Sequence, residues 1–253
     1  MKYLIASIGI ALIAGVIYIT APAKKTVKNL ENPPFAMVQL FTSQGCSSCP
    51  DADKLLEEIS KTYKDENVFL MSYHVDYWNR LGWEDPFSKK AYTQLQYAYS
   101  NKFNSRTAYT PQAVINGKVG FVGSNRSKME IQLKNYLSKP AKNMVKLSEV
   151  SHTDEKVSFN YKVEGKVSGK KLKIALIIDK KNTQIKRGEN GGRTLSNINI
   201  VVNEKELNLL DSSGAGIIAI PELVDSKDRI SLIAYIQDDN LNISAADKSN
   251  VQF

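Results

Sequence analysis

The sequence predicts an α/β domain over residues 36–140, followed by an all-β, sandwich-like domain over residues 141–253. Two observations support this division. Up to residue 140, apolar runs of strand length alternate with segments whose apolar residues recur at helical spacing. Beyond residue 140, short runs of alternating apolar and polar residues are separated by turn residues, and no long helical pattern is evident. The helices are therefore expected in the first domain, and the second is expected to consist of strands.

The first 23 residues differ in composition from the rest of the chain. Lys2 precedes the uncharged, largely apolar run 3–19, and Ala21 and Ala23 are small residues of the kind that signal peptidases require. We expect residues 1–23 to be a secretory signal peptide. The alternative is an uncleaved N-terminal membrane anchor that attaches the protein through residues 3–19, because this largely apolar run of 17 residues approaches the length of a membrane span.

The polar segment 24–35 is expected to be a linker. Both alternatives for the N-terminus predict export to a location outside a bacterial cytoplasm, where the protein is periplasmic, secreted or membrane-anchored. Such compartments permit disulfides and employ proteins that make or break them.

Composition and charge narrow the classes of function. The 253 residues are 42% hydrophobic and 24% charged, which is typical of a soluble globular protein. The net charge of +8 comes from Lys and Arg that are spread along the chain without a dense basic block. A solvated basic surface explains this charge better than a nucleic-acid site, so no nucleic-acid partner is expected.

The chain contains only two cysteines, Cys46 and Cys49, at C-x-x-C spacing. They follow the apolar run 36–41 and precede Pro50, which suits the first turn of a helix, so the pair is predicted to lie on a strand-to-helix turn. Backbone N–H groups and the helix dipole favour a thiolate at that position. Cys46 is expected to be the more exposed and nucleophilic thiol, and Cys49 to resolve a mixed disulfide formed on Cys46.

Two other roles of a C-x-x-C pair are alternatives to redox chemistry. A C-x-x-C pair can be half of a zinc site, but zinc would need two further ligands, and the sequence offers no third cysteine and only His74 and His152. The pair can also be a short structural disulfide. Redox chemistry is favoured over both, so no metal is expected and the Cys46–Cys49 disulfide is itself the expected cofactor.

A second apolar run, residues 68–75, completes a β-α-β unit with the cysteines at its top. The segment 74–87 follows it and is dense in aromatic and ionisable side chains. Because ligands of open α/β sheets lie beyond the carboxyl ends of the strands, this segment is predicted to line the redox site. The candidate lining residues are Gln44, Gly45, His74, Asp76, Trp78 and Trp83. The alternative stays open that the tryptophans pack on the core and that His74 is simply hydrogen-bonded.

Three further elements complete the first domain. Residues 89–103 have apolar spacing near 3.6 and are predicted to be a helix. Asn116-Gly117 separates two apolar runs and is the strongest hairpin signal in the chain. Residues 127–137 are predicted to form a short helix that Pro140 ends.

This order, with CSSC after the first strand and Thr110-Pro111 just before the hairpin, resembles the thioredoxin fold with a helical insertion. Four stretches resemble a family of exported bacterial thioredoxin-like proteins, DUF1223: QLFTSQGCSSCPDAD, HVDYWNRLGWEDPFS, YTPQAVING and RGENGGRTLSNINIVV. The resemblance implies that Pro111 follows a cis peptide bond and faces the dithiol, and that Thr110 and Pro111 bind substrate. The chain differs from thioredoxin itself in having Gln44-Gly45, not a tryptophan, before Cys46.

The second domain is predicted from seven strand candidates, at residues 145–150, 157–163, 172–178, 194–202, 205–210, 216–220 and 230–237. Between two of them lies the glycine-rich, charged loop 186–193, KRGENGGR. A phosphate cradle would need a helix after the loop, and a strand-like run follows instead, so the loop is interpreted as a turn. A second hypothesis is that it packs against the first domain near the dithiol.

These observations predict an exported thiol-disulfide oxidoreductase that exchanges with a protein or small-molecule thiol or disulfide. A rival hypothesis is a copper-binding or copper-delivery protein with Cys46, Cys49 and His74 as ligands, because soft thiolates suit Cu(I). Exported copper proteins of the Sco type use two cysteines and a histidine, but at a different spacing. A third hypothesis is a binding module of the same fold without catalysis.

Overall fold

The computed structural model describes residues 32–251, so the expected signal peptide or anchor, and most of the expected linker, lie outside the described residues. Within this range the chain forms three α-helices, one short 3-10 helix and eleven strands. None of the helices between residues 32 and 251 is long and apolar enough to cross a membrane.

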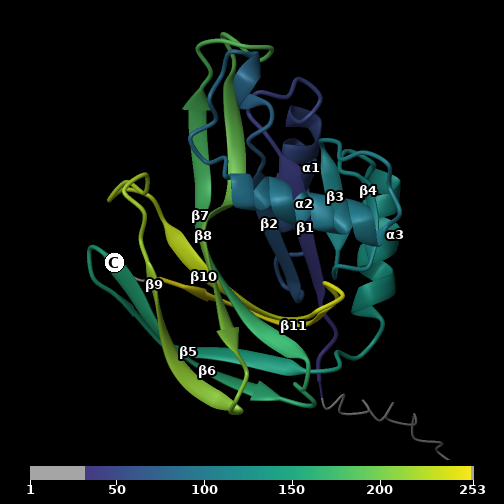
Figure 1. Cartoon of the computed structure of the whole chain (residues 1–253), viewed down its shortest axis with the longest axis vertical. Coiled ribbons are helices and arrows are strands. Elements are labelled where there is room, and N and C mark those ends of the chain that lie inside the picture. Colours follow the sequence, from purple (N-terminus) through teal and green to yellow (C-terminus); the bar gives the residue numbers. More distant parts are fainter. Residues whose placement is uncertain (1–31, 252–253) are drawn as a thin grey trace, which may run out of the picture.

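Eight of the strands form one mixed sheet in the order β11-β10-β7-β8-β2-β1-β3-β4 (Figure 1). Their bounds are β1 Ala36–Thr42, β2 Val68–His74, β3 Gln112–Ile115, β4 Val119–Val122, β7 Lys170–Gln184, β8 Thr194–Asn208, β10 Ile230–Asp238 and β11 Ile243–Asn250. Strand β1 pairs parallel with β2 and antiparallel with β3. Strand β8 pairs antiparallel with β7 over almost its whole length, and parallel with β2 at Ser72 and Ile200.

The predicted fold class is wrong. It separated a thioredoxin-like α/β domain with a helical insertion from an all-β sandwich, whereas the described chain is mostly strand and its largest sheet combines strands from both parts. The physical reason is the length of the β7–β8 hairpin, whose strands have 15 residues each and reach the edge of β2. There, the hydroxyl of Ser72 donates to the carbonyl of Ile198 at 2.7 Å, which ties the two parts of the sheet together.

Helices cover both faces of the N-terminal half of this sheet. Helices α1 (Pro50–Thr62) and α3 (Arg126–Leu137) pack on the face that carries Val38 and Leu40 of β1. Helix α2 (Lys90–Lys102) packs on the opposite face and crosses β1 and β2 in Figure 1. Because side chains alternate along a strand, β1 contributes to both cores. Its burial on both faces explains why its sequence reads as a continuous apolar run.

Local signals placed these elements correctly. Pro50 opens α1, and the side chain of Asn125 caps α3 by accepting a hydrogen bond from the backbone N–H of Lys128 at 2.9 Å. The predicted hairpin is confirmed: β3 pairs antiparallel with β4, and Asn116 and Gly117 turn the chain with φ of 48° and 65°.

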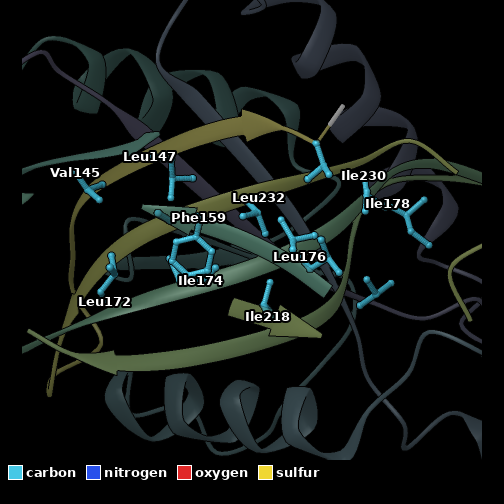
Figure 2. Packing of buried hydrophobic residues seen from close by; sticks show 14 of the residues in the cluster. Val145, Leu147, Phe159, Leu172, Ile174, Leu176, Ile178, Ile218, Ile230 and Leu232 are labelled. Carbon is cyan, nitrogen blue, oxygen red and sulfur yellow. The ribbon is translucent and has the colours of Figure 1, made fainter. Parts of the chain in front are cut away.

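The remaining strands form a second sheet, in the order β5-β6-β9, with bounds Met144–His152, Lys156–Glu164 and Ser213–Ala219. This sheet packs face to face on the C-terminal half of the large sheet. Figure 2 shows Phe159 of β6 and Ile218 of β9 directed toward side chains of β7 and β10 such as Ile174, Leu176 and Leu232. Two sheets therefore pack face to face, as in a sandwich. One of them is the C-terminal half of the large sheet, so they do not form a separate sandwich domain.

Candidate functional site

Cys46 and Cys49 form a disulfide in the turn between β1 and α1. Cys49 is the N-cap residue of α1, and its carbonyl accepts hydrogen bonds from the N–H groups of Ala52 and Asp53 at 2.9 and 3.1 Å. The backbone N–H of Cys49 donates to the carbonyl of Cys46 at 3.2 Å. The structure therefore places the pair on the strand-to-helix turn that the sequence predicted.

Both cysteines are fully buried, with 0% of either residue exposed, whereas Ser47 and Ser48 between them are exposed. The prediction that Cys46 is the more exposed of the two is therefore wrong. Its cover comes from segments far along the chain, which local spacing does not reveal.

Two hydroxyl groups, those of Thr110 and Ser48, contact the sulfur of Cys46, and that of Ser48 lies at 3.4 Å. The Thr110–Pro111 peptide bond is cis, as expected. The hydroxyl of Thr110 donates to the sulfur of Cys46 at 3.3 Å and accepts a hydrogen bond from the indole N–H of Trp78 at 2.8 Å. The Thr110 hydroxyl therefore links the side chain of Trp78 to the sulfur of Cys46.

The other predicted lining residues divide into two groups. Gln44, Gly45 and Trp83 belong to the turn: the indole N–H of Trp83 donates to Gln44 at 3.2 Å, and a side chain at Gly45 would meet the Cβ of Trp78 at 3.3 Å. Asp76 bonds elsewhere, because its carboxylate accepts from the hydroxyl of Thr93 in α2 at 2.6 Å. Asp76 thus anchors α2 to the end of β2.

A buried ionisable cluster lies beneath the turn. The ring nitrogen Nδ1 of His74 is 2.7 Å from the carboxylate of Asp85, and the same carboxylate oxygen accepts from the backbone N–H of Gln44 at 2.8 Å. Asp53 of α1 accepts from the hydroxyl of Thr42 at 3.2 Å. The cluster therefore connects the end of β1, the start of α1 and the segment after β2.

Burial and mutual charge set the protonation of this cluster. Burial raises the pKa of Asp53 to about 7, although the charge of His74 and the hydrogen bond from Thr42 oppose the increase. Burial alone would raise the pKa of Asp85, but His74 and the backbone N–H groups of Gln44 and Phe87 hold it below its ordinary value. The pKa of His74 is raised, because the attraction of Asp85 and Asp53 exceeds the lowering by burial.

No group of three or more His, Cys, Asp or Glu side chains within residues 32–251 is arranged to hold a metal ion. Copper binding would need the reduced pair, and in this structure the sulfurs of Cys46 and Cys49 are bonded to each other. His74 turns its Nδ1 to Asp85, and its Nε2 is buried without a hydrogen-bond partner among the described residues.

The loop between β7 and β8 packs against the disulfide turn, as the second hypothesis for residues 186–193 proposed. The side-chain amide of Asn190 donates to the carbonyls of Gln44 and Cys46 at 3.0 and 2.9 Å. Arg193 orients this amide by donating to its oxygen at 2.7 Å. The carboxylate of Glu189 accepts from the backbone N–H of Ser47 at 3.0 Å.

A family model described as "Protein of unknown function (DUF1223)" matches residues 37–237. This match spans most of the chain, including the disulfide turn and the β7–β8 loop. The chain belongs to the DUF1223 family. The resemblance found in the sequence is thereby confirmed at the level of the family.

Two solved structures share the fold of this DUF1223 protein over most of its length. Protein AGR_C_4864 from Agrobacterium tumefaciens has 25% identity and a TM-score of 0.62, with 87% of this chain and 94% of that chain covered. HBP35 of Porphyromonas gingivalis has 17% identity and a TM-score of 0.59, with 87% and 76% covered, and shows likeness of fold alone. No curated protein matches the chain.

Sequence reasoning named His74 but missed Asp53 and Asp85 as members of the buried cluster of this DUF1223 protein. A signal for Asp53 was available, because it lies three residues before Leu56 and so on the buried side of α1. Asp85 carried no comparable signal, since it lies in an irregular segment. Its burial depends on contacts with β1 and β2.

Replacement of Asn190 by alanine is expected to destabilise the protein by about 1–3 kcal/mol, because the buried carbonyl of Gln44 loses this donor. Urea denaturation measures the change in the free energy of unfolding. Asn208→Ala, at an exposed position in β8, is the matched control and is expected to change stability by less than about 0.5 kcal/mol. Equal effects of the two substitutions would contradict a clamping role for Asn190.

Proposed function

We propose that this DUF1223 protein is an exported thiol-disulfide oxidoreductase whose redox pair is Cys46 and Cys49. One observation carries the proposal: the C-x-x-C disulfide lies at the N-terminus of α1, with the Thr110 hydroxyl donating to the sulfur of Cys46. A helix N-terminus and a hydroxyl donor both stabilise negative charge on sulfur. The thiolate form of Cys46 is therefore more stable than that of an ordinary cysteine, which makes Cys46 a better nucleophile and a better leaving group at neutral pH.

The exchange takes place in two steps. A partner thiolate attacks the sulfur of Cys46, the Cys46–Cys49 bond breaks, and Cys49 leaves as a thiolate. A second thiolate of the partner then attacks the partner sulfur of this mixed disulfide and releases Cys46. The partner gains a disulfide and loses two electrons, which the cysteine pair takes up as a dithiol. The reverse sequence reduces a partner disulfide.

Asp53 supplies an ionisable group beneath the turn, close to Cys49 in the chain. It follows Cys49 by one helical turn, and its backbone N–H is bonded to the Cys49 carbonyl at 3.1 Å. Because burial raises the pKa of Asp53 to about 7, its carboxyl group can hold or release a proton near neutral pH.

The burial of both cysteines means that exchange requires local opening of their cover. The same burial supports a second function of the pair, namely a structural bridge in a protein that binds its partner without catalysis. The two functions differ in what reduction does to the fold. A redox pair is reduced while the protein stays folded, whereas a structural bridge is reduced together with loss of tertiary structure.

The test is equilibration of the protein with mixtures of reduced and oxidised glutathione. We expect a reversible transition between the disulfide and the dithiol, which titration of the free thiols measures. The near-ultraviolet circular dichroism spectrum should not change during this transition. Cys46→Ser is the control and should show no such transition. If reduction occurs only together with unfolding, the pair is a structural bridge and the proposed oxidoreductase function is wrong.

A further inference from the structure

The β7–β8 loop carries side chains that contact the disulfide turn. The N–H of Gly192 donates to the carbonyl of Ile185, and the N–H of Ile185 donates to the carbonyl of Arg193, both at 2.8 Å. Gly188 has φ of 77°, and a side chain there would come within 3.2 Å of the Cβ of Trp83. The loop is therefore held by its own hydrogen bonds and seated on the segment that also lines the turn.

Glu189 is the charged residue of this loop that contacts the backbone of the disulfide turn. Its carboxylate accepts from the backbone N–H of Ser47 at 3.0 Å, and Ser47 directly follows Cys46. The hydrogen bonds from Ser47 lower the pKa of Glu189, so its side chain is a carboxylate at neutral pH. A fixed negative charge thus lies beside the cysteine that is proposed to become a thiolate.

The two redox states respond differently to this charge. The disulfide is neutral and is not repelled by a carboxylate. The reduced pair carries a thiolate at Cys46, which a neighbouring carboxylate repels.

We propose that Glu189 sets the redox balance of the Cys46–Cys49 pair by favouring the disulfide over the dithiol. This inference rests on the proposed function and assigns Glu189 as a positioning residue that tunes the pair without reacting itself. The buried charged groups Asp53, His74 and Asp85 lie beneath the turn, and Arg193 acts through Asn190. Asp51 of α1 and Lys186 and Arg187 of the loop are exposed charged residues close to the turn or to Glu189 in the chain. None of them is altered by a change at position 189.

Glu189→Gln tests the charge alone, because an amide oxygen can still accept from the N–H of Ser47. We expect the ratio of dithiol to disulfide at a fixed glutathione ratio to rise roughly threefold to tenfold at low salt, with a lower pKa of the Cys46 thiol. The increase should shrink in about 1 M salt, because Glu189 is exposed and salt screens exposed charges. Glu189→Lys is expected to move the ratio further in the same direction.

The matched control is Glu155→Gln, which removes the same charge from an exposed position in the turn between β5 and β6 and should leave the ratio unchanged. A normal transition in the wild type together with an unchanged ratio in both Glu189 variants would overturn the role of Glu189 and leave the oxidoreductase intact. A wild type without any transition would remove both proposals. Circular dichroism of each variant verifies that the comparison is made between folded proteins.

Discussion

Replacement of Cys49 by alanine is expected to abolish turnover and to leave mixed disulfides on Cys46. When the pair reduces a partner disulfide, Cys46 attacks it and Cys49 then releases the partner by attacking the sulfur of Cys46, so a chain without Cys49 keeps the partner attached. The helix N-terminus and the Thr110 hydroxyl still act on Cys46, so this thiol retains its reactivity. Non-reducing gel electrophoresis of cells that express Cys49→Ala should show adducts that a reductant removes.

Cys46→Ala is the matched control, since it also leaves one cysteine, but at the N-cap of α1 and without the Thr110 contact. Adducts should be absent or rare in this variant. Equal amounts of adduct on both variants would indicate nonspecific oxidation of an uncovered thiol. Absence of adducts from Cys49→Ala, with the protein folded, would contradict Cys46 as the nucleophile.

Asp53→Asn is expected to stabilise the protein above pH 7 and to flatten the dependence of its stability on pH. The pKa of Asp53 is about 7 in the folded protein, against an ordinary value of 3.8. Between these two values the folded state holds a proton that the unfolded state has lost. The free energy of unfolding therefore falls as pH rises from about 4 to about 7, by about 4 kcal/mol in total. Asparagine is neutral at every pH, so Asp53→Asn does not lose this free energy of unfolding as the pH rises.

Urea denaturation of the wild type and of Asp53→Asn at pH 5.5 and pH 8.5 measures the difference. The wild type should lose stability between these two conditions, and Asp53→Asn should lose much less of it. Asp51→Asn is the control, because Asp51 lies two residues before Asp53 on the exposed side of α1. This variant should show the same dependence of stability on pH as the wild type. The same pH dependence in Asp53→Asn as in the wild type would show that this carboxyl group is ionised in the folded protein.

Local sequence determined the features that depend on a few neighbouring residues. The C-x-x-C spacing with Pro50 behind it predicted the strand-to-helix turn, and Asn116-Gly117 predicted the β3–β4 hairpin. Backbone preferences of proline, asparagine and glycine act within a turn, so such elements can be read without knowledge of the rest of the chain. The motifs that resemble DUF1223 extended this to the family and to the cis bond before Pro111.

Only the tertiary structure decided which strands share a sheet and what covers the cysteines. Periodicity indicates that a segment is a strand but not its partner, so the pairing of β8 with β2, between Ile200 and Ser72, was missed and the fold class was wrong. The burial of Cys46 and the clamp by Asn190 follow from that pairing, because it brings the β7–β8 loop to the turn. Contacts between residues more than 100 positions apart are decided by the packing of the whole chain, to which no short stretch of sequence is a guide.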